Sequence, residues 1–279
     1  MMPAEFNEIS PAKINLFLKI IGKRDDGYHN LRSGVTLINL YDEVSAQKSS
    51  EFKVKYTGEF APPDNIFKDC IVEKIFSKFK IVKPQYSFTI KKNIPVQSGL
   101  GSASSNAAAV LRILKKLDYK EVKTINFSEI GADIPLFVEN QDSLVRGIGD
   151  ITIKQLFPKY YFLLIKPTLN FSTEDMYNEV NVNDIKFDLT LDTDEISESD
   201  MGNDFEVIAD RKYPEISNLL KFMRSYSDVI FSRLTGSGSC IYSAFEKKDS
   251  AEKALIIFKE KFPNYWCQVV ENNFTKLSI

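Results

Sequence analysis

Apolar and polar positions alternate through residues 13–20 (KINLFLKI), which predicts a β-strand. The aliphatic side chains of this stretch share one face, while Lys13 and Asn15 share the other. Because alternate residues on one face of a strand lie about 7 Å apart, these two side chains can reach the same ligand. The turn sequence RDDG at residues 24–27 ends the strand and predicts a hairpin into residues 31–40.

Apolar side chains recur at helical spacing in the segment that follows residue 105, which predicts an amphipathic helix. Glycine and proline interrupt the pattern at residues 130–135 (IGADIP), and we expect Pro135 to hold Ile134 in an extended conformation. The other predicted elements are strands at 51–56, 86–91, 160–166, 228–234, 239–245 and 266–271, helices at 65–79 (N-cap Asn65), 214–226 (Pro214 in the first turn) and 249–262, and a short helix from Ser172 to about Tyr177.

The elements after residue 160 alternate as expected for an antiparallel sheet with helices on one face, an α+β arrangement. A domain boundary near residues 152–159 would divide the chain into an N-terminal domain, residues 1–155, and a C-terminal domain, residues 156–279. Residues 184–204 carry many acidic and few large apolar side chains, so we expect a solvated, mobile connection there.

Composition narrows the possible partners of the protein. The 279 residues include 36 basic and 38 acidic side chains, and a net charge of −2 gives no basic field for nucleic acid. The three cysteines are scattered without C-x-x-C spacing, which argues against a zinc site or disulfides and favours a reducing compartment. The N-terminal residues resemble no secretory signal, and no apolar run reaches membrane-spanning length, so we expect a cytoplasmic protein with no membrane partner.

Residues 95–108 (PVQSGLGSASSNAA) form a glycine-serine loop that passes directly into the helix. By composition alone it could be a linker, but it lies between a predicted strand and a predicted helix. Such a junction gathers free backbone N–H groups at the positive end of a helix dipole, which suits a phosphate group. The loop lacks the Gly-Lys-Ser/Thr of a Walker A motif and the third glycine of a dinucleotide fingerprint.

The loop resembles the phosphate-binding motif of the GHMP kinases, the superfamily of galactokinase, homoserine kinase, mevalonate kinase and phosphomevalonate kinase. It departs from that motif only at Ser102 and Ala103, where glycine is usual. Three further motifs follow the family order, with P-A-K-I-N before the loop and G-A-D-I-P and G-S-G-S-C after it. Within the superfamily the likeness is strongest to the kinases that act on 4-diphosphocytidyl-2-C-methyl-D-erythritol, because they share G-Y-H at residues 27–29.

The resemblance implies a two-domain GHMP kinase fold, with an N-terminal ribosomal-protein-S5-like α/β domain, a C-terminal ferredoxin-like α+β domain and the active site in the cleft between them. It implies an ATP-dependent small-molecule kinase that phosphorylates the 2-hydroxyl of the cytidine diphosphate methylerythritol, a step of the non-mevalonate isoprenoid route. Magnesium is expected with ATP, although the sequence specifies no ligand for it. Another GHMP kinase, of homoserine or mevalonate type, and a catalytically silent nucleotide-binding relative remain as alternatives.

The resemblance also assigns roles to individual residues. Each has an ordinary structural alternative: a solvated charge for Lys13, a surface histidine for His29, a turn or cap residue for Asp133 and a core aromatic for Tyr177. The implied site consists of the catalytic residues Lys13 and Asp133, the ATP-binding residues Pro95, Val96, Gln97, Ser98, Gly99, Leu100, Gly101, Ser102, Ala103, Ser104 and Ser105, the substrate-binding residues Asn15, Tyr28, His29 and Tyr177, and the phosphate-proximal loop Gly236, Ser237 and Gly238.

Overall fold

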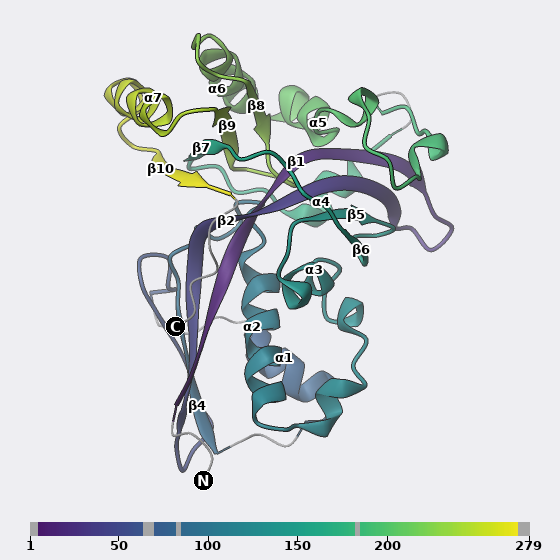
Figure 1. Cartoon of the computed structure of the whole chain (residues 1–279), viewed down its shortest axis with the longest axis vertical. Coiled ribbons are helices and arrows are strands. Elements are labelled where there is room, and N and C mark those ends of the chain that lie inside the picture. Colours follow the sequence, from purple (N-terminus) through teal and green to yellow (C-terminus); the bar gives the residue numbers. More distant parts are fainter. Residues whose placement is uncertain (1–4, 64–69, 82–84, 182–184, 273–279) are drawn as a thin grey trace.

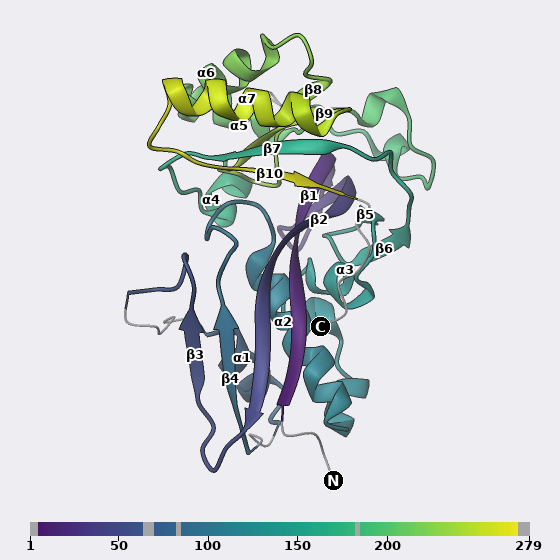
Figure 2. The same cartoon turned by 60° about the vertical axis from the view of Figure 1, so that its left-hand side comes forward.

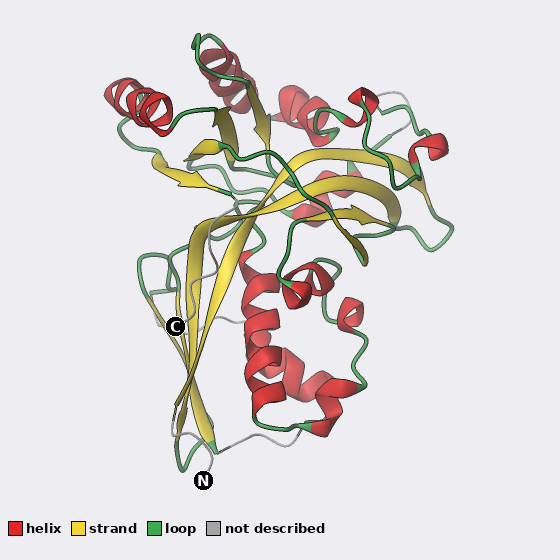
Figure 3. Ribbon diagram, in the orientation of Figure 1, coloured by secondary structure: helices red, strands yellow, loops and turns green. Residues whose placement is uncertain are grey.

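Two β-sheets, each carrying helices on one face, make up the protein (Figure 1 and Figure 3). The computed structural model describes residues 5–63, 70–81, 85–181 and 185–272. Within these residues, no helix has the length and apolar character that crossing a membrane requires.

The first sheet has six strands in the order β3-β4-β2-β5-β6, with β1 paired to β2. The pair β1–β2 is a long antiparallel hairpin that bends out of this sheet and passes beneath the second one (Figure 1). The strands are β1 (Glu5–Lys23), β2 (His29–Lys48), β3 (Val54–Thr57), β4 (Tyr86–Lys91), β5 (Ser143–Arg146) and β6 (Ile151–Lys154).

Helices cover one face of the first sheet, and α2 lies along its centre (Figure 2). The apolar side of α2 is almost entirely buried against β1 and β2, which explains the helical spacing of its apolar residues. The helical elements of this part are α1 (Ile71–Lys78), α2 (Ser102–Lys116), α3 (Ile134–Glu139) and the short 3-10 helices η1 (Lys120–Lys123) and η2 (Phe127–Glu129).

The second sheet is antiparallel throughout and has the order β10-β7-β9-β8. Helices α6 and α7 lie over one of its faces (Figure 2), and the bent hairpin β1–β2 packs on the other. The elements are β7 (Tyr161–Lys166), α4 (Thr173–Asn178), η3 (Leu189–Leu191), η4 (Glu198–Asp200), α5 (Phe205–Lys212), α6 (Pro214–Arg224), β8 (Phe231–Leu234), β9 (Ile241–Phe245), α7 (Lys248–Lys261) and β10 (Trp266–Glu271).

Strand β7 shows why this sheet needs covering on both faces. Leu163 and Ile165 point into the core under the helices, whereas Phe162 and Leu164 point into the core shared with β1. All four side chains are fully buried. A strand buried on both faces reads as a continuous apolar run, as residues 160–166 do.

Most predicted elements are present. Strands β4 and β10 have the predicted bounds, α6 begins at Pro214, and Ser172 caps α4 by accepting a hydrogen bond from the Asp175 amide. Helix α1 is seen from Ile71, and its predicted N-cap, Asn65, lies outside the described residues. The two short strands β5 and β6 and helix α5 have too little periodicity to have been predicted.

One local prediction is wrong. Ile134 is not extended but is the first residue of α3, with Asp133 at the N-cap and Pro135 in the first turn. Proline is compatible with the first turn of a helix because the backbone N–H groups there have no partner within the helix. This preference outweighs the steric bias that proline places on the residue before it.

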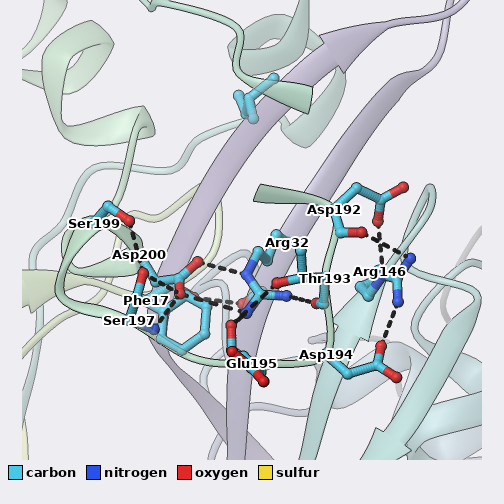
Figure 4. Close-up of polar contacts among 12 residues, drawn as sticks. Phe17, Arg32, Arg146, Asp192, Thr193, Asp194, Glu195, Ser197, Ser199 and Asp200 are labelled. Carbon is cyan, nitrogen blue, oxygen red and sulfur yellow. Dashed lines mark hydrogen bonds and ion pairs between the residues drawn. The ribbon is translucent and has the colours of Figure 1, made fainter. Parts of the chain in front are cut away.

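The acidic segment is mostly exposed in the residues described from 185 onward, as expected, but it is tied to the first sheet by several contacts. The carboxylate of Asp200 is fully buried and pairs with Arg32 of β2 at 2.5 Å, and Arg32 also donates to the carbonyls of Thr193 and Glu195 (Figure 4). Arg146 of β5 holds Asp192 at 2.7 Å in the same view. Acidic residues of this segment therefore pair with two arginines of the first sheet, which composition alone could not reveal.

Candidate active site

A cavity of about 1020 Å³ lies where the bent hairpin β1–β2 meets the start of α2 and the second sheet. Strands β1 and β2, the loop before α2, the start of α3, helix α4 and the β8–β9 loop all contribute to its wall. Six separate segments predicted to carry the site therefore converge on one cavity.

The glycine-serine loop is held between β1 and the second sheet. The Lys13 amide donates to the Leu100 carbonyl at 3.0 Å, and the Cys240 amide donates to the Ser98 carbonyl at 3.1 Å. Gly99 has a positive φ of 75°, and a Cβ there would lie 2.2 Å from the Thr235 carbonyl oxygen. Only glycine permits this close approach.

Gly101, also at a left-handed φ, is the N-cap of α2, and no acidic residue occupies the first turn of the helix. The backbone N–H groups of this turn and the helix dipole thus face the cavity without a carboxylate of the helix to neutralise them. Of the predicted ATP-binding residues, Leu100 and Ser105 do not line the cavity; both are buried. The other nine line it.

Lys13 and Asn15 lie together on the cavity side of β1, as their spacing predicts. The Lys13 ammonium donates to Asn15 Oδ1, and Asn15 Nδ2 donates to Ser33 Oγ at 2.8 Å. The pairing of β1 with β2 shifts register between Asn15 and Phe17, so the strand bulges next to the site. Bulges re-aim side chains, and this one leaves both polar groups facing the cavity.

Asp133 lines the same cavity from the N-cap of α3. Burial lowers the pKa of Lys13, and the negative charge of Asp133 partly opposes that effect. The two charges therefore interact, although among the described residues no ion pair within 4 Å joins them. Catalytic hydrogen bonds often form only once the reactants are in place.

An aromatic pocket lies in the same cavity. The rings of His29 and Tyr177 stack at 5.5 Å with an interplanar angle of 22°. Among the described residues, His29 Nε2 is buried without a hydrogen-bond partner, so this nitrogen can bond to a ligand in the cavity. Burial and the charge of Lys23 lower the pKa of His29, and Tyr28 beside it is 60% exposed.

The loop between β8 and β9 closes the cavity from the second sheet. A Cβ on Gly236 would lie 3.1 Å from Lys13 Nζ, and Ser237 Oγ lies 3.0 Å from Thr173 Oγ1. Gly238 does not line the cavity and packs instead against Phe171.

The sequence prediction missed several polar residues of this region. Lys92 and Asn106 line the cavity, and Asp42 binds both of them from β2. The only local signal for Lys92 was its position just before the loop. Asn106 belongs to the loop motif but is not among the predicted site residues, and it lies in the second turn of α2.

The chain resembles known kinases along most of its length. The sequence profile of the GHMP kinases N terminal domain matches residues 65–153, and that of the GHMP kinases C terminal domain matches residues 191–264. The 4-diphosphocytidyl-2-C-methyl-D-erythritol kinase of Francisella philomiragia is 36% identical over 247 residues, which cover 85% of this chain and 86% of the relative. The enzyme of that name from Buchnera aphidicola is 33% identical over 272 residues, and the match covers 92% of each chain.

A crystal structure of 4-(cytidine 5'-diphospho)-2C-methyl-D-erythritol kinase has the same fold. It superposes with a TM-score of 0.74 at 24% identity, over 96% of this chain and all of the other. The two-sheet arrangement, with the cavity between the sheets, is thus the α+β fold of the GHMP kinases, as the sequence motifs predicted. On these identities and coverages, the chain belongs to the 4-diphosphocytidyl-2-C-methyl-D-erythritol kinase family of the GHMP kinases.

Proposed function

We propose that this protein transfers the γ-phosphoryl group of ATP to the 2-hydroxyl of 4-diphosphocytidyl-2-C-methyl-D-erythritol, giving the 2-phosphate and ADP. The enzyme would act in the cytoplasm on a precursor of the non-mevalonate isoprenoid route. The observation that carries the proposal is a single cavity that combines a phosphate-type loop, Lys13, Asp133 and a histidine nitrogen awaiting a hydrogen bond.

The pocket at His29 suits a flat, polar ligand such as cytosine. A pyrimidine can stack on an aromatic face while its amide-like edge bonds to a ring nitrogen. Tyr28, which is exposed, and Tyr177, which is half-buried and stacked on His29, are the aromatic residues at hand. We assign base binding to these three residues and substrate contact also to Asn15.

The phosphates of ATP would bind along residues 95–105 at the start of α2. Phosphoryl transfer depends mainly on holding the phosphates, offsetting their charge and aligning the attacking hydroxyl. The backbone N–H groups of the loop perform the first task. Gly236 and Ser237 would confine the phosphates from the opposite side, next to the Lys13 ammonium.

Lys13 and Asp133 would perform the chemistry. Asp133 accepts the proton of the 2-hydroxyl, either as a general base or late in a loose transition state. The Lys13 ammonium attracts the Asp133 carboxylate and offsets charge on the transferring phosphoryl group. Asn15 orients that ammonium through the hydrogen bond it accepts from Lys13.

Magnesium would accompany ATP and neutralise charge on the phosphates. This ion prefers oxygen ligands and usually binds through phosphates, waters and one or two side chains. The cavity wall offers oxygen donors of this type from Ser104, Asp133 and Glu174. We further propose that residues 1–155 and 156–279 are the two domains that meet at this cavity.

The test is ADP release from purified protein with Mg-ATP, with and without the cytidine diphosphate methylerythritol. We expect release that depends on the substrate, and a loss of about 100-fold or more in kcat for Asp133→Asn with the fold intact. Homoserine and mevalonate serve as control substrates and should give no release above background. Equal turnover of either control, or near-normal kcat in Asp133→Asn, contradicts the proposal.

A further inference from the structure

A buried polar cluster underlies the start of α2, directly behind the loop. Its members are Asp42 of β2, Lys92 just after β4, and Ser102 and Asn106 of α2. Lys92 is 3% exposed and Asp42 is fully buried, yet Lys92, Ser102 and Asn106 also border the cavity. The cluster thus joins the core of the first sheet to the wall of the active site.

Asp42 is the centre of the cluster. One carboxylate oxygen accepts from the amides of Asn93 and Ile94, at 2.7 and 2.9 Å. The other accepts from Lys92, from the Ser102 hydroxyl at 2.7 Å and from the Asn106 amide at 2.9 Å. A carboxylate held by this many donors has a fixed orientation, so it is a rigid anchor for whatever binds to it.

Ser102 is the first residue of α2, and its hydroxyl bonds within this cluster. It donates a hydrogen bond to Asp42 and accepts one from Lys92, so it acts as both donor and acceptor. The backbone of the same residue belongs to the turn whose N–H groups face the phosphate position. A glycine here, as the GHMP motif usually has, would remove the tie to Asp42 from the first residue of α2 and leave only that of Asn106, one turn further along.

We propose that Ser102 is a positioning residue, whose hydroxyl ties the first turn of α2 to the Asp42–Lys92 pair and so fixes the direction of the N–H groups that bind the phosphates of ATP. The proposal rests on the proposed function for the identity of the anion. We expect loss of the Ser102 hydroxyl to weaken nucleotide binding and not to lower kcat, because the same N–H groups contact the phosphates before and during transfer. It predicts little effect on the cytidine pocket, which lies at His29 and Tyr177.

The experiment measures the Kd of a non-hydrolysable ATP analogue with Mg²⁺ by titration calorimetry, alongside the KM values and kcat. We expect Ser102→Ala and Ser102→Gly to raise both the analogue Kd and the KM for ATP by about fivefold to tenfold, the usual net effect of one lost hydrogen bond. The kcat and the KM for the cytidine substrate should stay within about twofold. Ser102→Thr, which keeps the hydroxyl, should restore most of the affinity.

The matched control is Ser10→Ala. Ser10 on β1 accepts from Asn106 at 2.7 Å, so it belongs to the same network but does not line the cavity. Its loss should lower thermal stability without changing the analogue Kd by more than about twofold. Ser102→Gly keeps the test available if the alanine variant does not fold.

Three results would overturn the proposal: an unchanged analogue Kd in both Ser102 variants, an equal rise in Ser10→Ala, or no rescue by Ser102→Thr. Because the analogue Kd needs no turnover, the test does not depend on the acceptor substrate. A wild-type protein that binds the analogue but does not phosphorylate the cytidine substrate would refute the proposed function and leave the role of Ser102 decided by the Kd alone.

Discussion

Replacing Asp200 by alanine should destabilise the protein by about 3–5 kcal/mol, because it leaves the guanidinium of Arg32 buried without a counter-charge. Both side chains are 0% exposed, so water cannot take the place of the lost carboxylate. The carbonyls of Thr193 and Glu195 would remain as partners of Arg32, but they carry no charge (Figure 4).

The magnitude follows from comparing the buried ion pair with an exposed one on the same segment. Asp194 also contacts an arginine, Arg146, but its side chain is 67% exposed. Solvent and salt screen such a pair, and Asp194→Ala should cost only about 0–1 kcal/mol. Removing both buried charges together, as Arg32→Met with Asp200→Leu, should recover most of the loss, since no charge is then left without a partner.

Urea denaturation followed by circular dichroism measures these differences, provided that the slope of the free energy against urea stays constant. The buried and exposed single variants and the double variant form one series at a single pH and salt concentration. A cost below about 1 kcal/mol for Asp200→Ala would refute the reasoning, because it would mean that Arg32 finds water or another partner. So would equal costs for Asp200→Ala and Asp194→Ala.

Three further predictions concern the cavity. His29→Ala should raise the KM for the cytidine substrate about tenfold and leave the KM for ATP unchanged. Burial and Lys23 lower the pKa of His29, so the stability of the wild-type protein should fall as the pH drops below 6.5, where the unfolded chain takes up a proton first. Substrate affinity should fall only at the lower pH at which the folded imidazole is protonated. Burial lowers the pKa of Lys13 from 10.5, so kcat should decline with rising pH before pH 10.5 is reached. The contribution of Lys13 to stability should not fall in that range, because its side chain still binds the proton in the unfolded chain after losing it in the folded one. The Tyr242 hydroxyl donates to the Asn15 carbonyl at 2.9 Å. Tyr242→Phe should therefore lower the free energy of unfolding, measured in urea, by about 1 kcal/mol and lower kcat severalfold. An unchanged kcat would mean that the bulge of β1 keeps its shape without this hydrogen bond.

The parts of this protein that sequence reasoning predicts are those fixed by short stretches of chain. The spacing of Lys13 and Asn15 on one face of a strand needs only a period of two, and the capping of α4 by Ser172 needs only three residues. The passage from a glycine-serine loop into a helix is local in the same sense, although α2 begins at Ser102, inside the stretch predicted as loop. These predictions are confirmed because no distant partner is needed to decide them.

The parts that were missed depend on contacts between distant segments. Asp42 and Lys92 are 50 positions apart, and Arg32 and Asp200 are 168 positions apart. In the sequence each of these residues is one more charge, and for such a charge the exposed interpretation is usually correct. Only the folded chain shows which charges meet inside, and so the burial of Asp200 against Arg32 could not be predicted from the composition of this largely exposed segment.

The hairpin β1–β2 belongs to the cores of both sheets, which has a consequence for how the enzyme can be divided. Ile14 and Leu16 pack against Phe162 and Leu164 of β7, so much of the second sheet's lower face is covered by residues from the beginning of the chain. A fragment starting near residue 156 would expose that face to water, and a fragment ending there would leave the hairpin uncovered. We expect that neither half folds when expressed alone. Co-expression of the two halves should restore activity that each half lacks.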